Sequence, residues 1–346
     1  MTFNIIYTPN SVAATSFFIG SLLEYSDFNF RLVSNGCTIK ERNQLTQLSE
    51  SNCRLSYHCY PTNKCAVHGH VLNYLQAMTD EDYFCFMDSD IFAFSKISLA
   101  DFMYKNAAAY FSAMPIWVKD SECNMSSNFH IMSGNFNMLD NNQCIGGSYF
   151  AVYNNTQLTE IMQHYSVGFE QCRLSQLSIE AQQILKSINF RQSIFDTGKA
   201  INVLMNSHGL KLTNIDLSNL IHLGGLSFET SLRKNKTWKE NVKNNLQMYL
   251  PNSVLPKSIK TEDWSRFIKY YKDTPQEEYE INYNQKIVRR NLIRQYFLQV
   301  FNALKNNINI PDLPKIEDEE IQEKLVRAQK TYVMTYKDHF SNLHLD

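Results

Sequence analysis

The sequence predicts an α/β fold, in which a mainly parallel sheet is flanked by helices and followed by a helical C-terminal region. Three observations favour this class. Over the first 95 residues, short apolar runs alternate with segments of helical periodicity, which is typical of a parallel sheet. The run Tyr83–Met87 is apolar throughout, as a strand covered on both faces should be. After about residue 230 the pattern becomes helical instead.

Turn residues separate the predicted elements of the first half. Thr8-Pro9-Asn10 ends the first strand, and Ser34-Asn35-Gly36 ends the second. Strands are predicted at Phe3–Tyr7, Phe30–Val33, Cys53–Tyr57, Tyr83–Met87, Ala108–Met114 and Ser148–Tyr153, and helices at 12–25, Val67–Met78, 288–304 and Glu317–Tyr336. Residues 119–143 are rich in Ser, Asn and Met with little periodicity and predict a long loop, a kind of segment that is often functional.

Two domains are expected, a first domain over 1–230 and a helical C-terminal extension over 231–346. The first holds 13 Lys and Arg against 19 Asp and Glu, and the second holds 20 against 15. In the second, Val288, Leu292, Tyr296, Val300 and Leu304 form an apolar stripe that needs a packing partner. Opposite this stripe we expect a solvated basic face or a peripheral membrane contact, made of Lys286, Arg289, Arg290, Arg294 and Lys305.

Composition excludes several classes of protein. The chain has 346 residues, of which 44% are hydrophobic and 19% charged, so it is neither disordered nor of low complexity. A net charge of −1 provides no overall basic field for nucleic acid. No apolar run reaches the length of a transmembrane helix, and no basic segment opens a secretory signal. The eight Cys form no CxxC pair and predict reduced, mostly buried thiols, so a cytoplasmic location is expected.

The strongest chemical signal is Asp88-Ser89-Asp90. Carboxylates at i and i+2 leave an extended strand on the same side, where their oxygens suit Mg²⁺ or Mn²⁺. Asp80 and Asp82 have the same spacing but are expected to be solvated acids of a turn. Asp88 and Asp90 differ because apolar segments flank them on both sides, where an unused charge is costly. Strand ends are also where ligands bind in open α/β sheets.

The segment Phe86–Phe92, preceded by His68-Gly69 on a helix, resembles the metal-binding strand of GT-A glycosyltransferases, especially the family 2-like group. The resemblance covers roughly residues 3–228 and includes Ile145–Tyr153, Phe195–Gly198 and His222–Ser227. It implies the GT-A fold, a Rossmann-like mixed and mainly parallel sheet. It also implies a nucleotide-diphosphate sugar donor, a divalent metal, and transfer of a sugar, with a hexose favoured, to an acceptor hydroxyl of a glycan or another molecule.

The resemblance also implies roles for individual residues. Asp88, Asp90 and His222 are expected to bind Mn²⁺ or Mg²⁺, and imidazole is a good Mn²⁺ ligand. Residues expected to contact the donor, with UDP favoured over GDP, are Thr8, Pro9, Asn35, Lys64, His68, Asp88, Ser89, Gly146 and Gly147. Asp196 is expected to be the general base of an inverting transfer. Many relatives have an acidic pair where this chain has Phe195-Asp196, so that assignment rests on one carboxylate.

Alternatives accompany each assignment. Asp196 lies before a helical pattern, where Asp is a preferred capping residue. Trp117 is as well suited to core packing as to stacking on a sugar.

The function of the whole chain also has alternatives. Enzymes with the same fold also catalyse retaining transfer. A nucleotidyltransferase would need a Gly-rich basic loop after the first strand, which Thr8–Ser11 does not provide. A non-catalytic nucleotide-sugar-binding protein would have no need of Asp88, Asp90, Asp196 and His222.

Overall fold

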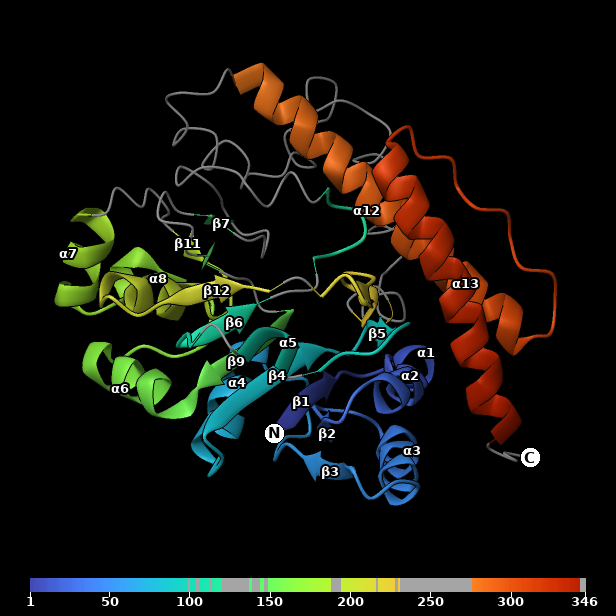
Figure 1. Ribbon diagram of the computed structural model, residues 1–346, viewed down its shortest axis with the longest axis horizontal. Coiled ribbons are helices and arrows are strands. Elements are labelled where there is room, and N and C mark those ends of the chain that lie inside the picture. The colour runs from blue at the N-terminus through green and yellow to red at the C-terminus, as the bar shows by residue number, and fades with distance from the viewer. Residues whose placement is uncertain are drawn as a thin grey trace.

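A seven-stranded mixed sheet forms the centre of the molecule, in the order β12-β6-β9-β4-β1-β2-β3 (Figure 1). The computed structural model describes residues 1–98, 100–103, 106–111, 114–119, 137–138, 144–145, 149–187, 194–215, 217–227, 230 and 276–342. Helices flank the sheet, and the described part of the C-terminal region, residues 276–342, holds two long helices. The predicted α/β class, with its mainly parallel sheet and helical C-terminal region, is confirmed.

The strands of this sheet are β1 (Thr2–Tyr7), β2 (Asn29–Ser34), β3 (Leu55–Cys59), β4 (Tyr83–Asp88), β6 (Ala109–Phe111), β9 (Phe150–Asn154) and β12 (Leu212–Asn214). β1 pairs in parallel with both β2 and β4, and β3 extends the parallel part beyond β2. β9 is antiparallel to β4 and β6. The carboxyl ends of β1, β2, β3 and β4 therefore meet at one edge of the sheet, where polar side chains from all four can converge.

The helices are α1 (Val12–Thr15), α2 (Phe18–Tyr25), α3 (Ile39–Glu50), α4 (His68–Ala77), α5 (Ala100–Met103), α6 (Asn155–Tyr165), α7 (Ile179–Ser187), α8 (Lys199–Ser207), α12 (Gln276–Lys305) and α13 (Glu319–Asn342). The helix predicted over 12–25 is thus divided into two. α3 was not predicted, although Thr38 and Glu41 form the capping box that opens it. Minor strands pair as β5 (Ile91–Ala93) with β13 (Leu220–His222), β7 (Asn137–Met138) with β8 (Cys144–Ile145), and β10 (Cys172–Arg173) with β11 (Ile194–Phe195).

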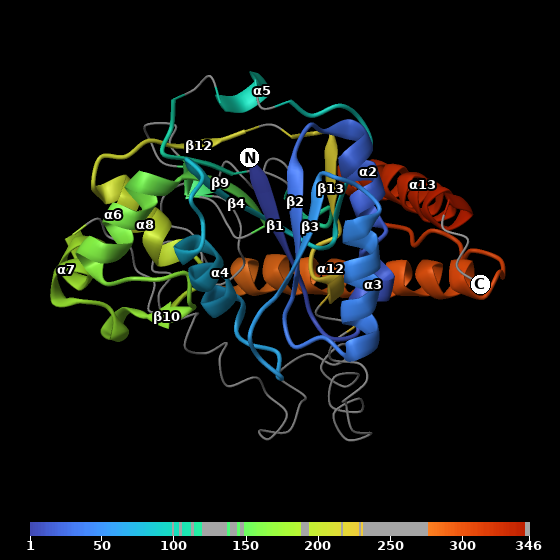
Figure 2. The same ribbon diagram turned by 90° about the horizontal axis from the view of Figure 1, so that it is seen from below.

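Strand β4 contributes to a separate core on each face of the sheet. Phe84 and Phe86 are buried with side chains of α4, α6, α7 and α8, whereas Cys85 and Met87 are buried with side chains of α2 and α3. Figure 2 shows β4 and β1 between these groups of helices. Burial on both faces explains why the strand is apolar throughout, and it fixes the position at which Asp88 leaves the core.

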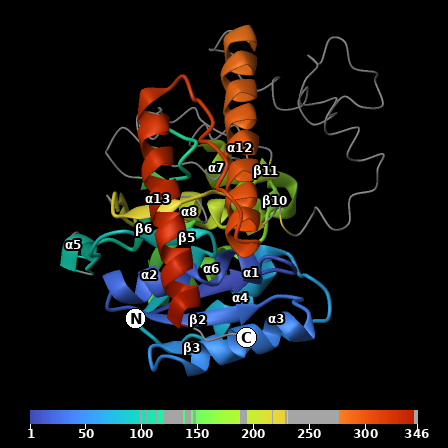
Figure 3. The same ribbon diagram turned by 90° about the vertical axis from the view of Figure 1, so that its right-hand side faces the viewer.

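The two C-terminal helices pack against the first half of the chain (Figure 3). Tyr332 of α13 lies with its ring centroid 5.2 Å from that of Phe17 and 5.3 Å from that of Phe18. On α12, Phe297 and Val300 are fully buried in the same core. Residues from both sides of the expected boundary near 230 therefore share one core.

The predicted apolar stripe of α12 is only partly correct. Val288 and Leu292 are 49% and 40% exposed, whereas Ile293 is fully buried. Arg294, expected on the solvated basic face, is also buried, with only 9% exposed. Residues spaced by four drift about 40° around a helix at each step, so the start of the stripe turns away from the core that its end contacts.

Removing residues 280–346 is expected to destabilise the rest of the chain and to expose its core. Ile293, Phe297, Val300 and Tyr332 would be lost from it, and each contributes about 1.5–3 kcal/mol by burial. Together they match the roughly 5–15 kcal/mol that stabilises a whole domain. Thermal unfolding and binding of a dye that detects exposed apolar surface measure the effect. Unchanged unfolding after truncation would contradict it.

Within the described residues, no helix is both long enough and apolar enough to cross a membrane. Among the cysteines whose burial the structure describes, Cys37 and Cys85 are buried, Cys172 is partly buried, and Cys53, Cys59 and Cys65 are exposed, so the prediction of mostly buried thiols is wrong for this set.

Candidate metal and donor site

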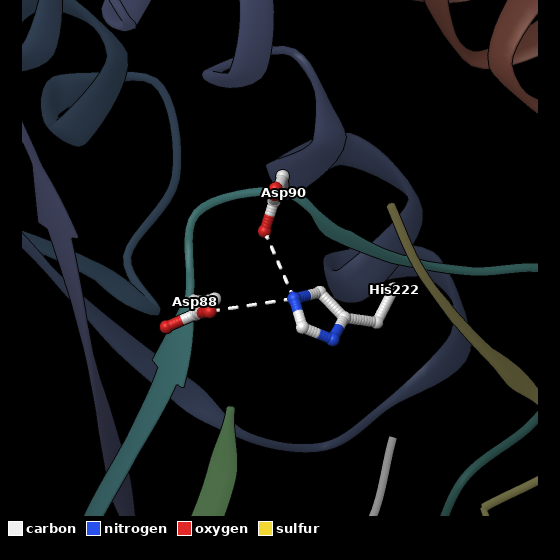
Figure 4. Close-up of side chains that lie close together, drawn as sticks. All are labelled: Asp88, Asp90 and His222. Atoms are coloured by element: carbon white, nitrogen blue, oxygen red, sulfur yellow. Dashed lines mark ion pairs between the residues drawn. The ribbon is translucent and has the colours of Figure 1, made fainter. Parts of the chain in front are cut away.

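Asp88 and Asp90 lie where the central strand β4 ends and β5 begins. The backbone N–H of Asp88 donates to the carbonyl of Tyr149 at 2.7 Å, which fixes the strand end. β5 then pairs antiparallel with β13, in a register that places His222 opposite Ile91. This pairing brings an imidazole from late in the chain beside the two carboxylates (Figure 4).

The three side chains converge on one point. Nε2 of His222 lies 3.3 Å from Oδ2 of Asp88 and 3.2 Å from Oδ1 of Asp90. One potential ligand atom from each residue lies within 4.8 Å of the others. The side chains of Asp90 and His222 are 1% exposed, whereas that of Asp88 is 28% exposed. Two carboxylates and an imidazole form a donor set suited to Mn²⁺, open to solvent on the side of Asp88.

Asp90 is also bonded to the turn that follows β13. Its Oδ2 accepts from the backbone N–H of Leu226 at 2.6 Å, and its carbonyl accepts from the N–H of Leu223 at 3.0 Å. Oδ1 is the oxygen that faces His222. The turn over 223–226 therefore fixes the rotation of the Asp90 carboxylate and leaves its other oxygen directed at the cluster.

The charges in the cluster perturb one another. Burial alone would lower the pKa of His222, but Asp90 and Asp88 outweigh it and raise the pKa to about 9. Burial alone would raise the pKa of Asp90, but His222 and the Leu226 N–H bring it below its ordinary value. Burial raises the pKa of Asp88. At neutral pH and without a cation, His222 is therefore protonated and neutralises part of the carboxylate charge.

Metal affinity is expected to increase with pH, because an ion that binds Nε2 must displace the proton of His222. With a folded-state pKa of about 9, the apparent Kd for Mn²⁺ should fall about 10-fold between pH 7 and pH 8. Without metal, the stability of the fold depends on pH in the opposite direction and decreases as pH rises. The raised pKa adds stability that is complete below about pH 6.5 and is lost as pH rises through about 9. Mn²⁺ titrations and unfolding curves over this range, with His222→Gln as the control that should lose both trends, check the prediction.

Asp196 lies between β11 and α8, within electrostatic reach of this cluster. Its Oδ1 accepts from the N–H of Thr197 at 2.8 Å, but the N-cap of α8 is Gly198, with φ 73°. The carboxylate therefore does not cap the helix, which removes the main structural alternative for it. Burial raises the pKa of Asp196, with a smaller opposing effect of Thr197.

His68 begins α4 and lies within electrostatic reach of both Asp88 and Asp196. Burial lowers the pKa of His68, and Asp88 and Asp196 both oppose that shift. Its ring lies edge-on to Phe86, with centroids 6.5 Å apart. A largely neutral imidazole at a helix start, beside both acids, can donate to a phosphate oxygen or accept from a hydroxyl.

The remaining residues expected to contact a donor differ in their surroundings. Oγ of Ser89 is buried and has no hydrogen-bond partner among the described residues. Lys64 is exposed, and Thr8 and Pro9 are half-buried at the end of β1. Gly146 and Gly147 lie outside the described residues, as does most of 119–143.

Asn35 and Trp117 both have structural contacts within the fold. The amide of Asn35 donates to the carbonyl of Ala66 at 2.9 Å and accepts from its N–H at 2.8 Å. These bonds anchor the segment before α4, and a contact of Asn35 with the donor stays a prediction. Trp117 is 6% exposed and belongs to the core shared with α12, which favours packing over sugar stacking.

Comparisons with known proteins place the chain near solved glycosyltransferases at low similarity. No family model matches the chain, and no curated protein matches it. TarS 1-349 of S. aureus has 12% identity and a TM-score of 0.39, over 98% of this chain and 92% of that one. The Pyrobaculum calidifontis mannosyltransferase PcManGT, solved with GDP-Man and Mn²⁺, has 11% identity and a TM-score of 0.40, over 98% and 88%. The galactosyltransferase LgtC has 8% identity and a TM-score of 0.36, over 81% and 99%. Values this low carry no conclusion about activity.

Proposed function

We propose that this chain is a metal-dependent glycosyltransferase, which moves a sugar from a nucleotide-diphosphate sugar to an acceptor hydroxyl. The observation that carries the proposal is the convergence of Asp88, Asp90 and His222 at the end of the central strand β4. Asp196 lies within electrostatic reach of Asp88 but outside that ligand set. A charged cluster built into a core, open on one side, is typical of a catalytic site rather than of a structural ion pair.

Each residue then has a defined task. Asp90 and His222 would hold a divalent cation, Mn²⁺ or Mg²⁺, and Asp88 would reach it through water or hold the ribose of the donor. When bound, the ion supplies Lewis-acid stabilisation of the departing diphosphate. His68, at the start of α4, orients a phosphate oxygen. Asp196 accepts the proton of the acceptor hydroxyl, which gives direct displacement and an inverted product.

The same proposal includes the kind of donor, the transferred sugar and the acceptor. A UDP-sugar is favoured over a GDP-sugar, a hexose is the expected group, and the acceptor is a glycan or another hydroxyl compound. A cytoplasmic location and a peripheral membrane contact stay predictions. So does the division into a catalytic domain over 1–230 and a helical extension over 231–346.

A calorimetric titration with UDP- and GDP-sugars, with and without Mn²⁺, tests the proposal. Metal-dependent binding of one nucleotide-sugar, followed by transfer or slow hydrolysis, is the expected result. Binding without any turnover would favour a non-catalytic nucleotide-sugar-binding protein. Binding of a nucleoside triphosphate with release of pyrophosphate would favour a nucleotidyltransferase. No metal-dependent binding of any nucleotide-sugar would refute the proposal.

A further inference from the structure

The turn over 223–226 is hydrogen-bonded to two separate parts of the chain. On one side, Asp90 accepts from the N–H groups of Leu223 and Leu226. On the other side, Nε of Arg294, on α12, donates to the carbonyl of Gly224. The guanidinium is buried, and its charge also contributes to the lowered pKa of Asp90. A residue of the C-terminal helix is therefore connected to a candidate metal ligand through a single short turn.

Two adjacent glycines make this approach possible. Gly225 has φ 88°, and a Cβ at this position would overlap the guanidinium of Arg294. Gly224 has φ 76°, and a Cβ there would lie 2.5 Å from Nε1 of Trp117. Both conformations favour glycine, and both positions leave no space for a side chain. The Gly224-Gly225 pair thus lets Arg294 and Trp117 pack directly on the turn.

Arg294 is presented by a rigid element. Its neighbour Ile293 is fully buried, as is Phe297 one turn later. These side chains share a core with Ile221, Leu223 and Leu226, which come from β13 and the turn itself. A donor on a packed helix is held more accurately than one on a loop, as the support of a metal ligand requires.

We propose that Arg294 is a positioning residue, which holds the turn over 223–226 so that Asp90 and His222 keep the separation needed to share one cation. Arg294 donates to the carbonyl of Gly224 in the turn. The turn itself holds Asp90 through the N–H of Leu226, and it follows directly on β13, which carries His222. The metal part of this inference rests on the proposed function; the bonding of the turn does not. The proposal therefore assigns α12 a role in positioning the metal ligands.

Arg294→Ala and Arg294→Lys test the proposal, with Arg289→Ala as the matched control. Arg289 lies on the same helix, but its Nη1 pairs with Asp318 at 3.5 Å, a residue that is not part of the turn. Hydrogen exchange of residues 220–227, followed by mass spectrometry, reports the turn without any metal. Mn²⁺ affinity, followed by the electron paramagnetic resonance of free Mn²⁺, reports the ligands.

We expect Arg294→Ala to speed exchange over 220–227 at least 10-fold and to weaken Mn²⁺ binding by about 10–100-fold, as loss of a group supporting a ligand does. Arg294→Lys should show the same changes more weakly, because an ammonium keeps the charge but lacks the planar fork. Millimolar guanidinium should restore both properties to Arg294→Ala, and equal concentrations of NaCl should not. Arg289→Ala should behave as the wild type in both measurements.

Wild-type protection of 220–227 in both Arg294 variants would overturn the proposal. So would equal loss of protection across the whole chain in Arg294→Ala and Arg289→Ala, since that is general destabilisation. If Arg294→Ala does not fold, Arg294→Lys decides by the same two readouts. If the wild type binds no Mn²⁺, the proposed function fails, and hydrogen exchange alone still decides whether Arg294 holds the turn.

Discussion

Asp90→Asn is expected to abolish metal-dependent donor binding and to remove nearly all transfer. The substitution keeps the shape of the side chain, and its amide oxygen can still accept from Leu226. It removes the negative charge that faces His222 at 3.2 Å. Loss of a direct ligand should exceed the roughly 10–100-fold effect of losing a group that only supports one. Mn²⁺ titration and donor calorimetry of the same preparation measure it.

Asp80→Asn is the matched control for this variant. Asp80 and Asp82 repeat the i, i+2 spacing of Asp88 and Asp90, but they are exposed and follow α4 rather than a buried strand. Asp80→Asn should therefore keep wild-type binding and transfer. Full activity of Asp90→Asn, or of the wild type in excess chelator, would exclude the metal role.

The central strand and its two acids were predictable because local sequence determines them. Burial of β4 on both faces requires an unbroken apolar run, and the run ends where Asp88 reaches the edge of the sheet. His222 was predictable only from a family resemblance. Its position depends on the pairing of β5 with β13, a contact between distant segments that periodicity does not encode.

The part played by Arg294 was not predictable from the pattern of its own helix. One basic residue among five on a helix resembles any solvated cation. The predicted apolar stripe does not help, because its first two positions, Val288 and Leu292, turn away from the core. The available signal lay elsewhere, in Gly224-Gly225. Two adjacent glycines beside a candidate ligand indicate that something approaches the backbone closely, but only the structure identifies it as the guanidinium of α12.

Asp196→Asn is expected to fold and to bind the donor but to transfer poorly, by on the order of 10²–10⁴-fold. The carboxylate does not cap α8, because Gly198 occupies that position. Its raised pKa, caused by burial, improves it as a proton acceptor. Loss of a cap would instead cost about 1 kcal/mol of stability and leave the chemistry unchanged. Stability, donor affinity and turnover of one preparation distinguish the two roles.

The same residue determines the expected stereochemistry. A base that takes the acceptor proton during direct displacement must lie opposite the leaving diphosphate, so it cannot be a metal ligand. Asp196 meets the second of these requirements, because it is not one of the clustered metal-ligand candidates, which are Asp88, Asp90 and His222. The wild-type product should therefore have an inverted anomeric configuration, which proton NMR of the product reads directly. A retained configuration would exclude direct displacement while leaving the metal site intact. Near-normal turnover of Asp196→Asn would exclude the base role. The acceptor proton would then have to go to another group of the site, and His68, whose pKa is lowered by burial, is a candidate.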